Sequence, residues 1–186
     1  DLVTRWQSDQ QGGWLLGYND GQGRFARVQM EHFAGTGFGI NDSFLGGADL
    51  YLDGLDFFAF SARKLAFSGC AQRGIPATTA APLGMGAAVL NFLPGGMTFE
   101  EYFRWDGCSE EQMALRFLIG LSPAMLQRGY LVDRSAVDFK ARKGPSTPIA
   151  CEICAGMAAT QALKILLGRG EVVAAPRGLH FDAYRN

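Results

Sequence analysis

The sequence predicts an α/β fold with helices on both faces of a sheet, and residues 48–92 provide most of the grounds for it. Residues 48–52 form a short apolar run that is typical of a buried strand. A helical stretch follows over 57–73 and ends at Gly74, a residue type favoured just after a helix. Residues 75–80 form the next predicted strand, and the order strand, helix, strand indicates a parallel βαβ unit.

Two carboxylates, Asp53 and Asp56, directly follow the first strand of this unit. Ligands of open α/β sheets bind at the carboxyl ends of the strands. Magnesium in proteins is held by one or two carboxylates together with phosphate oxygens and water. The position therefore favours a site in which one of the two binds Mg²⁺ or positions a nucleotide phosphate. The alternative is that Asp56 caps the helix that follows, and one residue can do both.

Arg63 lies two helical turns beyond Asp56, close to the same face of the predicted helix. It is a candidate to pair with a phosphate group or with a neighbouring subunit. The alternative is a solvated charge on the helix surface. The neighbouring Lys64 and the distant Lys164 are predicted to be surface charges.

The order of features along the chain predicts a single domain over residues 1–186. The segment 1–26 contains an Asn-Asp-Gly turn between two apolar runs, which predicts a hairpin. The α/β part covers 27–96, and the part over 97–186 is mostly helical. Outside the βαβ unit, the predicted strands are 27–33, 87–93 and 178–181. The predicted helices start after Ser109, Ser122, Ser135 and Thr147. The helix after Thr147 is the longest and covers 149–167.

Two Gly-x-Gly elements, at 21–23 and 84–86, have the spacing that begins a nucleotide-binding fingerprint. Such a fingerprint needs a strand before the glycines and a helix after them. The first element lies in the predicted hairpin, and the second is followed by a predicted strand. The sequence therefore shows no phosphate-binding loop.

Cys151 and Cys154 have the C-x₂-C spacing of half a zinc or redox site. Cys70 and Cys108 are isolated from them and from each other, so no zinc is expected and the pair is predicted to be structural. An activated thiolate at Cys151, near the start of a helix, is the alternative.

The composition is that of an ordinary globular domain, with 48% apolar and 19% charged residues. A formal net charge of −1 argues against a nucleic-acid surface. No segment has the uninterrupted apolar length of a membrane span, and the first residues lack the pattern of a signal peptide. The four irregularly spaced cysteines indicate reduced thiols, so we expect a cytoplasmic protein.

Three separated segments together carry a family resemblance. Residues 48–56 have a hydrophobic strand ending in Asp-x-x-Asp, residues 74–86 a strand with a Gly-containing turn, and residues 150–168 a late helix with Cys, Ala and Gly followed by Ala-x-Lys-x-Leu. In this order the segments resemble the superfamily of ThiF, MoeB and HesA, adenylyltransferases similar to ubiquitin-activating enzymes. The resemblance covers about 27–170 and is nearest to the ThiF-type branch.

The resemblance implies a Rossmann-like three-layer fold that binds ATP with Mg²⁺. Enzymes of this family adenylate the C-terminal carboxylate of a small protein and release pyrophosphate. Asp56 matches the family's Asp that contacts Mg²⁺ and ATP, Asp53 matches the preceding strand-end Asp, and Arg63 matches the Arg of the following helix. We therefore expect catalytic roles for Asp56 and Arg63, cofactor binding by Asp53 and Asp56, and a Mg²⁺ contact at Asp56.

The expected partners are a small ubiquitin-like or sulfur-carrier protein or a peptide, together with a second copy of the chain. No nucleic acid and no membrane are expected. The family's Gly-rich ATP loop, ribose-binding Asp and Asn-x-x-Arg segment would precede residue 27, and residues 1–26 contain none of them. Phe57 stands where the family usually has Asn. The chain thus resembles the C-terminal two-thirds of such a domain, without its N-terminal nucleotide-loop unit.

Two other functions remain open at this point. One is a catalytically inactive ThiF-like module that docks a carrier protein or a complete subunit, which the lack of a nucleotide loop favours. The other is a nicotinamide- or flavin-dependent oxidoreductase, because the predicted sheet type suits both cofactors.

Overall fold

Seven strands form one sheet, and the strands lie side by side in the order of the sequence. The computed structural model describes residues 44–130, 144 and 146–185 in full, and the backbone of three strands before them. The pairs β3–β4 and β4–β5 are parallel, and the four other pairs are antiparallel. The strands are β1 (Arg5–Ser8), β2 (Trp14–Gly17), β3 (Phe25–Glu31), β4 (Leu50–Asp53), β5 (Ala77–Leu83), β6 (Gly86–Phe92) and β7 (Leu179–Asp182).

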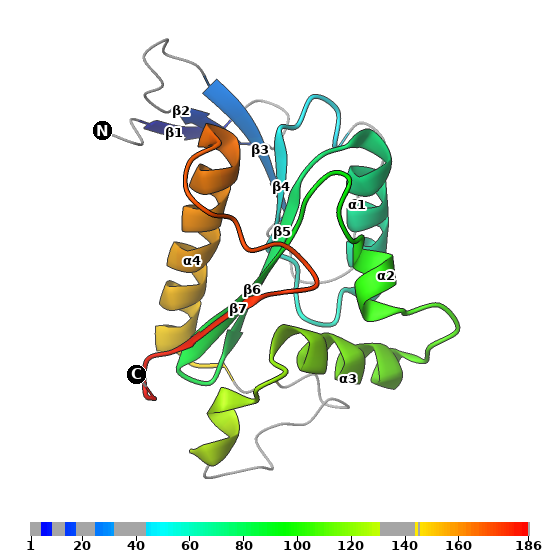
Figure 1. The fold of residues 1–186 in the computed structure, drawn as a ribbon, viewed down its shortest axis with the longest axis vertical. Helices are drawn as coiled ribbons and strands as arrows, with labels where there is room; N and C mark the ends of the chain where they lie inside the picture. The colour runs from blue at the N-terminus through cyan, green and yellow to red at the C-terminus, as the bar shows by residue number, and fades with distance from the viewer. Residues whose placement is uncertain are drawn as a thin grey trace.

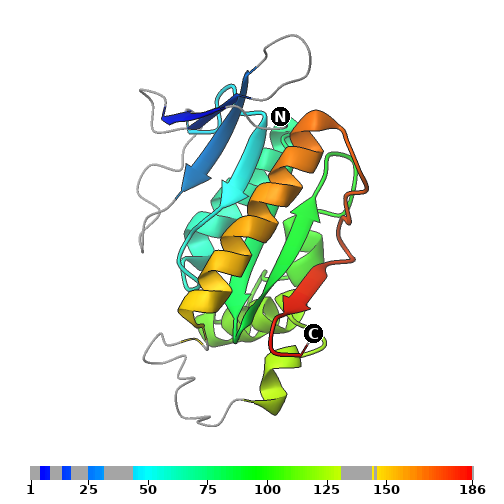
Figure 2. The ribbon, with the colours of Figure 1, turned by 90° about the vertical axis from the view of Figure 1, so that its left-hand side faces the viewer.

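Helices cover both faces of this sheet, as Figure 1 shows with the sheet seen edge-on. One long helix crosses one face, and three shorter helices lie on the other (Figures 1 and 2). The predicted Rossmann-like three-layer α/β fold is therefore confirmed. The helices are α1 (Phe60–Arg73), α2 (Phe99–Phe103), α3 (Glu110–Leu121) and α4 (Pro148–Leu167), with a 3₁₀ turn η1 (Leu126–Gly129) after α3.

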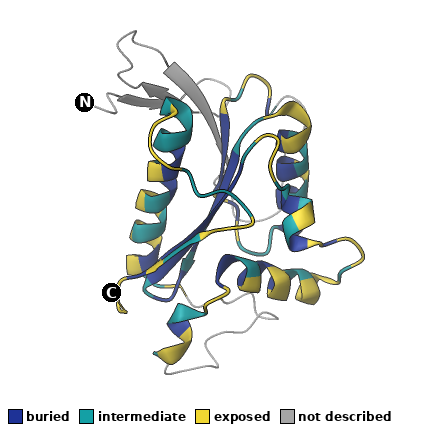
Figure 3. Ribbon diagram, in the orientation of Figure 1, coloured by how far each residue is buried: buried dark blue, intermediate teal, exposed yellow. Residues whose placement is uncertain are grey.

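The two faces of β4 contribute to two different hydrophobic layers. Leu50 and Leu52 pack on Ala158 and Ala162 of α4, and Tyr51 packs in the layer between the sheet and α1 to α3. Because side chains alternate along a strand, β4 is buried on both sides, as a central parallel strand should be. Figure 3 shows this burial along the sheet. The second layer contains an aromatic cluster, namely Phe60, Phe67, Phe92, Phe99, Phe103, Trp105 and Phe117.

Most predicted elements form where the local sequence places them. The hairpin before residue 27 is confirmed as β2 and β3, which pair in antiparallel fashion. The capping box at Ser109 starts α3, and Thr147 caps α4, which ends at Gly168 in the left-handed conformation. The predicted edge strand near the end of the chain is confirmed as β7.

One predicted helix turns out differently. The helix expected directly after Ser122 starts only at Leu126 and is a 3₁₀ turn. Met125, with a left-handed φ of 46°, precedes it, and this conformation interrupts a right-handed helix. The helix expected after Ser135 lies outside the described residues.

The Gly-x-Gly element at 84–86 is the turn between β5 and β6. It is followed by a strand and not by the helix that a phosphate-binding loop needs, as the sequence predicted. Gly84 has a φ of +62°, and a Cβ there would lie 2.3 Å from the hydroxyl of Tyr130. A Cβ at Gly86 would lie 2.0 Å from the carbonyl oxygen of Phe181 on β7. Both glycines are therefore needed for close packing of this turn.

Helix α4 combines a sheet contact with a largely apolar composition. It packs on β4, β5 and β6, and Gln161 on its inner side accepts a hydrogen bond from Asn91 of β6 at 3.2 Å. Its mean hydropathy is 1.4 over 18 residues, of which 22% are buried, so by length and composition alone it could cross a membrane. The sequence expectation of no such segment is not met on that measure, because the mean hydropathy stays at 1.4 although Glu152 and Lys164 interrupt the apolar run.

Candidate active site

The carboxyl end of β4 is where the structure places the two predicted carboxylates. Asp53 is the last residue of β4 and lies opposite Thr79 in the parallel register with β5. Beyond this level β5 continues to Leu83, so the β5–β6 hairpin extends past the end of β4. Residues 54–59 form a turn that leads into α1. The arrangement is the strand-end position at which open α/β sheets bind ligands.

Asp53 is buried, with 6% of its surface exposed, and protein groups satisfy both of its oxygens. Oδ2 accepts a hydrogen bond from Nε of Arg63 and another from the hydroxyl of Thr79, both at 2.7 Å. Oδ1 accepts from the amide of Leu55 at 3.2 Å. A buried carboxylate with three donors is a structural anchor, and it leaves little capacity to contact a ligand.

Arg63 is buried as well, with 2% exposed, although its position on a helix suggested a solvated charge. That interpretation is wrong because α1 turns this face toward the end of β4, where Asp53 pairs with it. The guanidinium also donates to the backbone carbonyls of Leu55, Asp56 and Phe57, at 2.9, 3.1 and 3.1 Å. It therefore lies inside the turn.

Asp56 is the exposed member of the pair. Its Oδ1 accepts a hydrogen bond from the amide of Phe58 at 2.9 Å, which closes a local turn two residues long. The first residue of α1 is Phe60, and Ala59 precedes it without any side-chain cap. The interpretation of Asp56 as the helix cap is therefore wrong, because the turn delays the helix by three residues. Its carboxylate faces solvent at the strand end.

Two residues that the sequence did not single out complete the site. Thr79 contacts Asp53 as described, and only the register of the two parallel strands brings them together. Phe117 of α3 places its ring 4.6 Å from the guanidinium carbon of Arg63. The same ring lies 5.2 Å from that of Phe57, so α3 covers the turn. Thr79 could have been predicted, because it lies in a predicted strand that was expected to pair with the strand ending at Asp53. No local pattern identified Phe117.

The residues fit a magnesium ion that is held mainly by a nucleotide. No group of three or more His, Cys, Asp or Glu side chains that could hold a metal occurs among the described residues. Magnesium, however, is commonly bound by one or two carboxylates plus substrate phosphates and water. Asp56 offers one exposed carboxylate for that purpose, and the oxygens of Asp53 are occupied.

Three of the four cysteines occupy different environments. Cys151 is exposed, Cys154 is half-buried, and Cys70 is buried under the aromatic cluster. Burial raises the pKa of the Cys154 thiol to about 11, and burial raises that of Cys70 to about 12. Neither is therefore an activated thiolate.

We expect iodoacetamide to alkylate Cys151 well before Cys70 and Cys154 in the folded protein. The thiolate is the reacting form, and a raised pKa together with burial suppresses it at both of the slower positions. Peptide mapping by mass spectrometry at mildly alkaline pH measures the three rates. In denaturant all should react alike, and fast modification of Cys70 in the folded protein would contradict the expectation.

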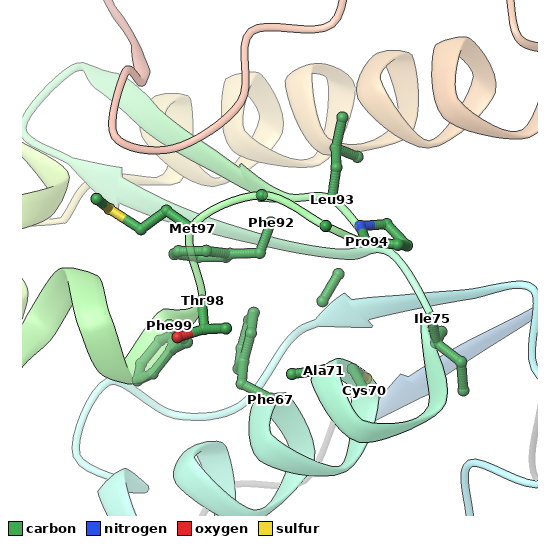
Figure 4. Close-up of a pocket in the computed structure, with 13 residues that line it drawn as sticks. Phe67, Cys70, Ala71, Ile75, Phe92, Leu93, Pro94, Met97, Thr98 and Phe99 are labelled. Atoms are coloured by element: carbon green, nitrogen blue, oxygen red, sulfur yellow. The ribbon is translucent and has the colours of Figure 1, made fainter.

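A cavity of about 60 Å³ lies toward the opposite end of the central strands, near the start of β5 and the end of β6. Figure 4 shows the side chains of Phe67, Phe92, Met97 and Phe99 around it. Its walls are mainly apolar, and it is separate from the carboxylates at the end of β4. It therefore does not belong to the candidate active site.

Comparison with known proteins identifies the family. One solved structure, described as "Crystal Structure of SeMet PaaA", is similar over 76% of this chain, with 16% sequence identity and a TM-score of 0.42. The similar region is 44% of that chain, so the present chain spans less than half of its length. None of the curated proteins matches. The model of the ThiF family matches residues 25–186, which is most of the sequence. The chain therefore belongs to the ThiF family.

Proposed function

We propose that these residues form part of an ATP-dependent adenylyltransferase of the ThiF type. The proposed substrate is the C-terminal carboxylate of a small ubiquitin-like or sulfur-carrier protein or of a peptide. A carboxylate oxygen attacks the α-phosphorus of ATP, the bond from that phosphorus to the β-phosphate breaks, and pyrophosphate leaves. The chain spans only part of the similar solved structure, and the activity of a whole protein of this kind is a proposal here.

The observation that best supports this proposal is the exposed Asp56 carboxylate on a turn that is anchored by buried groups. A nucleotide bound at the end of β4 would bring its phosphates close to this carboxylate. A magnesium ion would supply positive charge there, which stabilises the negative charge of the triphosphate as the bond breaks. Asp56 would hold that ion, and Asp53 and Arg63 would hold the turn.

Two other parts of the proposal do not depend on the site. Homodimer formation is expected from the family and a cytoplasmic location from the irregularly spaced cysteines, and no contact in the described residues bears on either. A catalytically inactive docking module of the same family remains the second candidate, since the phosphate-binding loop is not found in residues 1–26.

The first test is a calorimetric titration of the protein with ATP and Mg²⁺. We expect saturable ATP binding that Mg²⁺ strengthens, and we expect the replacement of Asp56 by alanine to remove this strengthening. A protein that is folded by circular dichroism and binds no ATP would contradict the enzymatic proposal and favour the docking module. A gain in ATP affinity from Mg²⁺ that survives in Asp56→Ala would contradict the assignment of this residue.

A further inference from the structure

We propose that Arg63 is a positioning residue, which acts on the reaction through Asp56 and does not touch ATP. The inference rests on the proposed function, and it replaces the expectation that Arg63 is catalytic. It follows from where the guanidinium lies, which groups it binds and how it is covered.

Hydrogen bonds from the guanidinium of Arg63 hold the backbone around Asp56. One terminal nitrogen donates to the carbonyl oxygens of Leu55 and Asp56, and the other donates to that of Phe57. Three consecutive carbonyl groups therefore point at one side chain. Such a turn exposes its side chains in a fixed direction, because each peptide plane is held by a separate bond. The carboxylate of Asp56 is thereby aimed outward.

Asp53 and Thr79 hold the guanidinium in place from the sheet. The Arg63–Asp53 pair is buried, with side-chain exposures of 2% and 1%, and Nε to Oδ2 is 2.7 Å. The hydroxyl of Thr79 donates to the same Oδ2. The charge of Arg63 is thus compensated inside the protein, and no phosphate is required to satisfy it.

Phe117 closes the remaining side of Arg63. Its ring lies 4.6 Å from the guanidinium carbon, a distance at which the ring face attracts a cation. Phe117 is itself 1% exposed, so solvent and solutes are kept from this side of the guanidinium. A phosphate could reach Arg63 only if α3 moved.

Lysine cannot replace arginine in this arrangement. Its ammonium group carries three donors on one atom, whereas the guanidinium presents donors on three nitrogens in a planar fork. Lysine at position 63 can still pair with Asp53, but it cannot reach three carbonyls at once. We therefore expect Arg63→Lys to keep most of the charge compensation and to release the turn that carries Asp56.

The test compares ATP affinity with and without Mg²⁺ in matched variants. If Arg63 acts through Asp56, Arg63→Lys weakens binding of ATP with Mg²⁺ by about tenfold and leaves metal-free ATP binding unchanged. Thr79→Val should act in the same direction by about threefold, and Thr79→Ser, which keeps the hydroxyl, should restore binding. Lys64→Gln serves as the control, because Lys64 is the next residue of α1 and makes an exposed ion pair with Asp106.

A second measurement needs no nucleotide. Hydrogen exchange at the amides of Leu55 and Phe58 should become about tenfold faster in Arg63→Lys and stay unchanged in Lys64→Gln. If metal-free ATP binding falls as much as binding with Mg²⁺, Arg63 touches the nucleotide and the inference is wrong. It is equally wrong if these amides exchange at the wild-type rate. Absence of ATP binding in the wild-type protein would instead contradict the proposed function.

Discussion

Replacing Asp56 with asparagine is expected to abolish ATP-dependent adenylation while the fold stays intact. Asparagine keeps the oxygen that accepts from the amide of Phe58, so the local turn should survive. It loses the negative charge that would hold Mg²⁺, and removing a group that stabilises a charged transition state costs on the order of a hundredfold or more in rate. Exchange of labelled pyrophosphate into ATP, with the acceptor present, measures the loss.

The stability of this variant separates loss of function from loss of fold. Asp56 is exposed and makes no ion pair among the described residues, so the free energy of unfolding should change by no more than about 0.5 kcal/mol. Asp106→Asn is the matched control, since Asp106 is another exposed aspartate outside the strand-end site, with Lys64 as its partner. Activity in Asp56→Asn close to that of the control would exclude Asp56 as the magnesium residue.

Local sequence patterns were sufficient for the elements that depend on local physics. Caps and periodicity predicted α3 and α4, because a side chain three residues away satisfies the helix end in both cases. The same patterns placed the start of α1 three residues too early. The turn at 54–59 is stabilised by Arg63, which lies six to eight residues beyond the carbonyl groups that it binds, and no local pattern indicates such a contact.

The sequence was sufficient to predict where the candidate site lies. It was less informative about the role of each residue in the site. A strand followed by Asp53 and Asp56 indicates where ligands bind in such sheets, and both residues lie there. The sequence did not show which of the two is buried, since that depends on the pairing of β4 with β5 and on Arg63. Burial of a charged helix residue becomes visible only when its partner on another element is known.

Replacing Asp53 with alanine is expected to destabilise the protein more than any other change at this site. It leaves the guanidinium of Arg63 buried and without its anionic partner, and it removes acceptors from Leu55 and Thr79. Breaking a buried ion pair in this way costs about 3–5 kcal/mol. For a protein of this size each kcal/mol lowers the melting temperature by about 2–4 °C, so thermal unfolding should show a large shift.

The double variant Asp53→Leu with Arg63→Met distinguishes a lost charge partner from lost packing. Both positions then carry apolar side chains, of which Met is close in volume to the Arg it replaces, and no charge is left buried. Such replacements are often close to neutral for stability, so the double variant should melt well above Asp53→Ala. Its turn at 54–59 would nevertheless lack the donors from Arg63, so ATP binding with Mg²⁺ should stay weak although the fold is restored. Equal melting temperatures for Asp53→Ala and the double variant would show that the cost of Asp53→Ala does not come from an unpaired guanidinium.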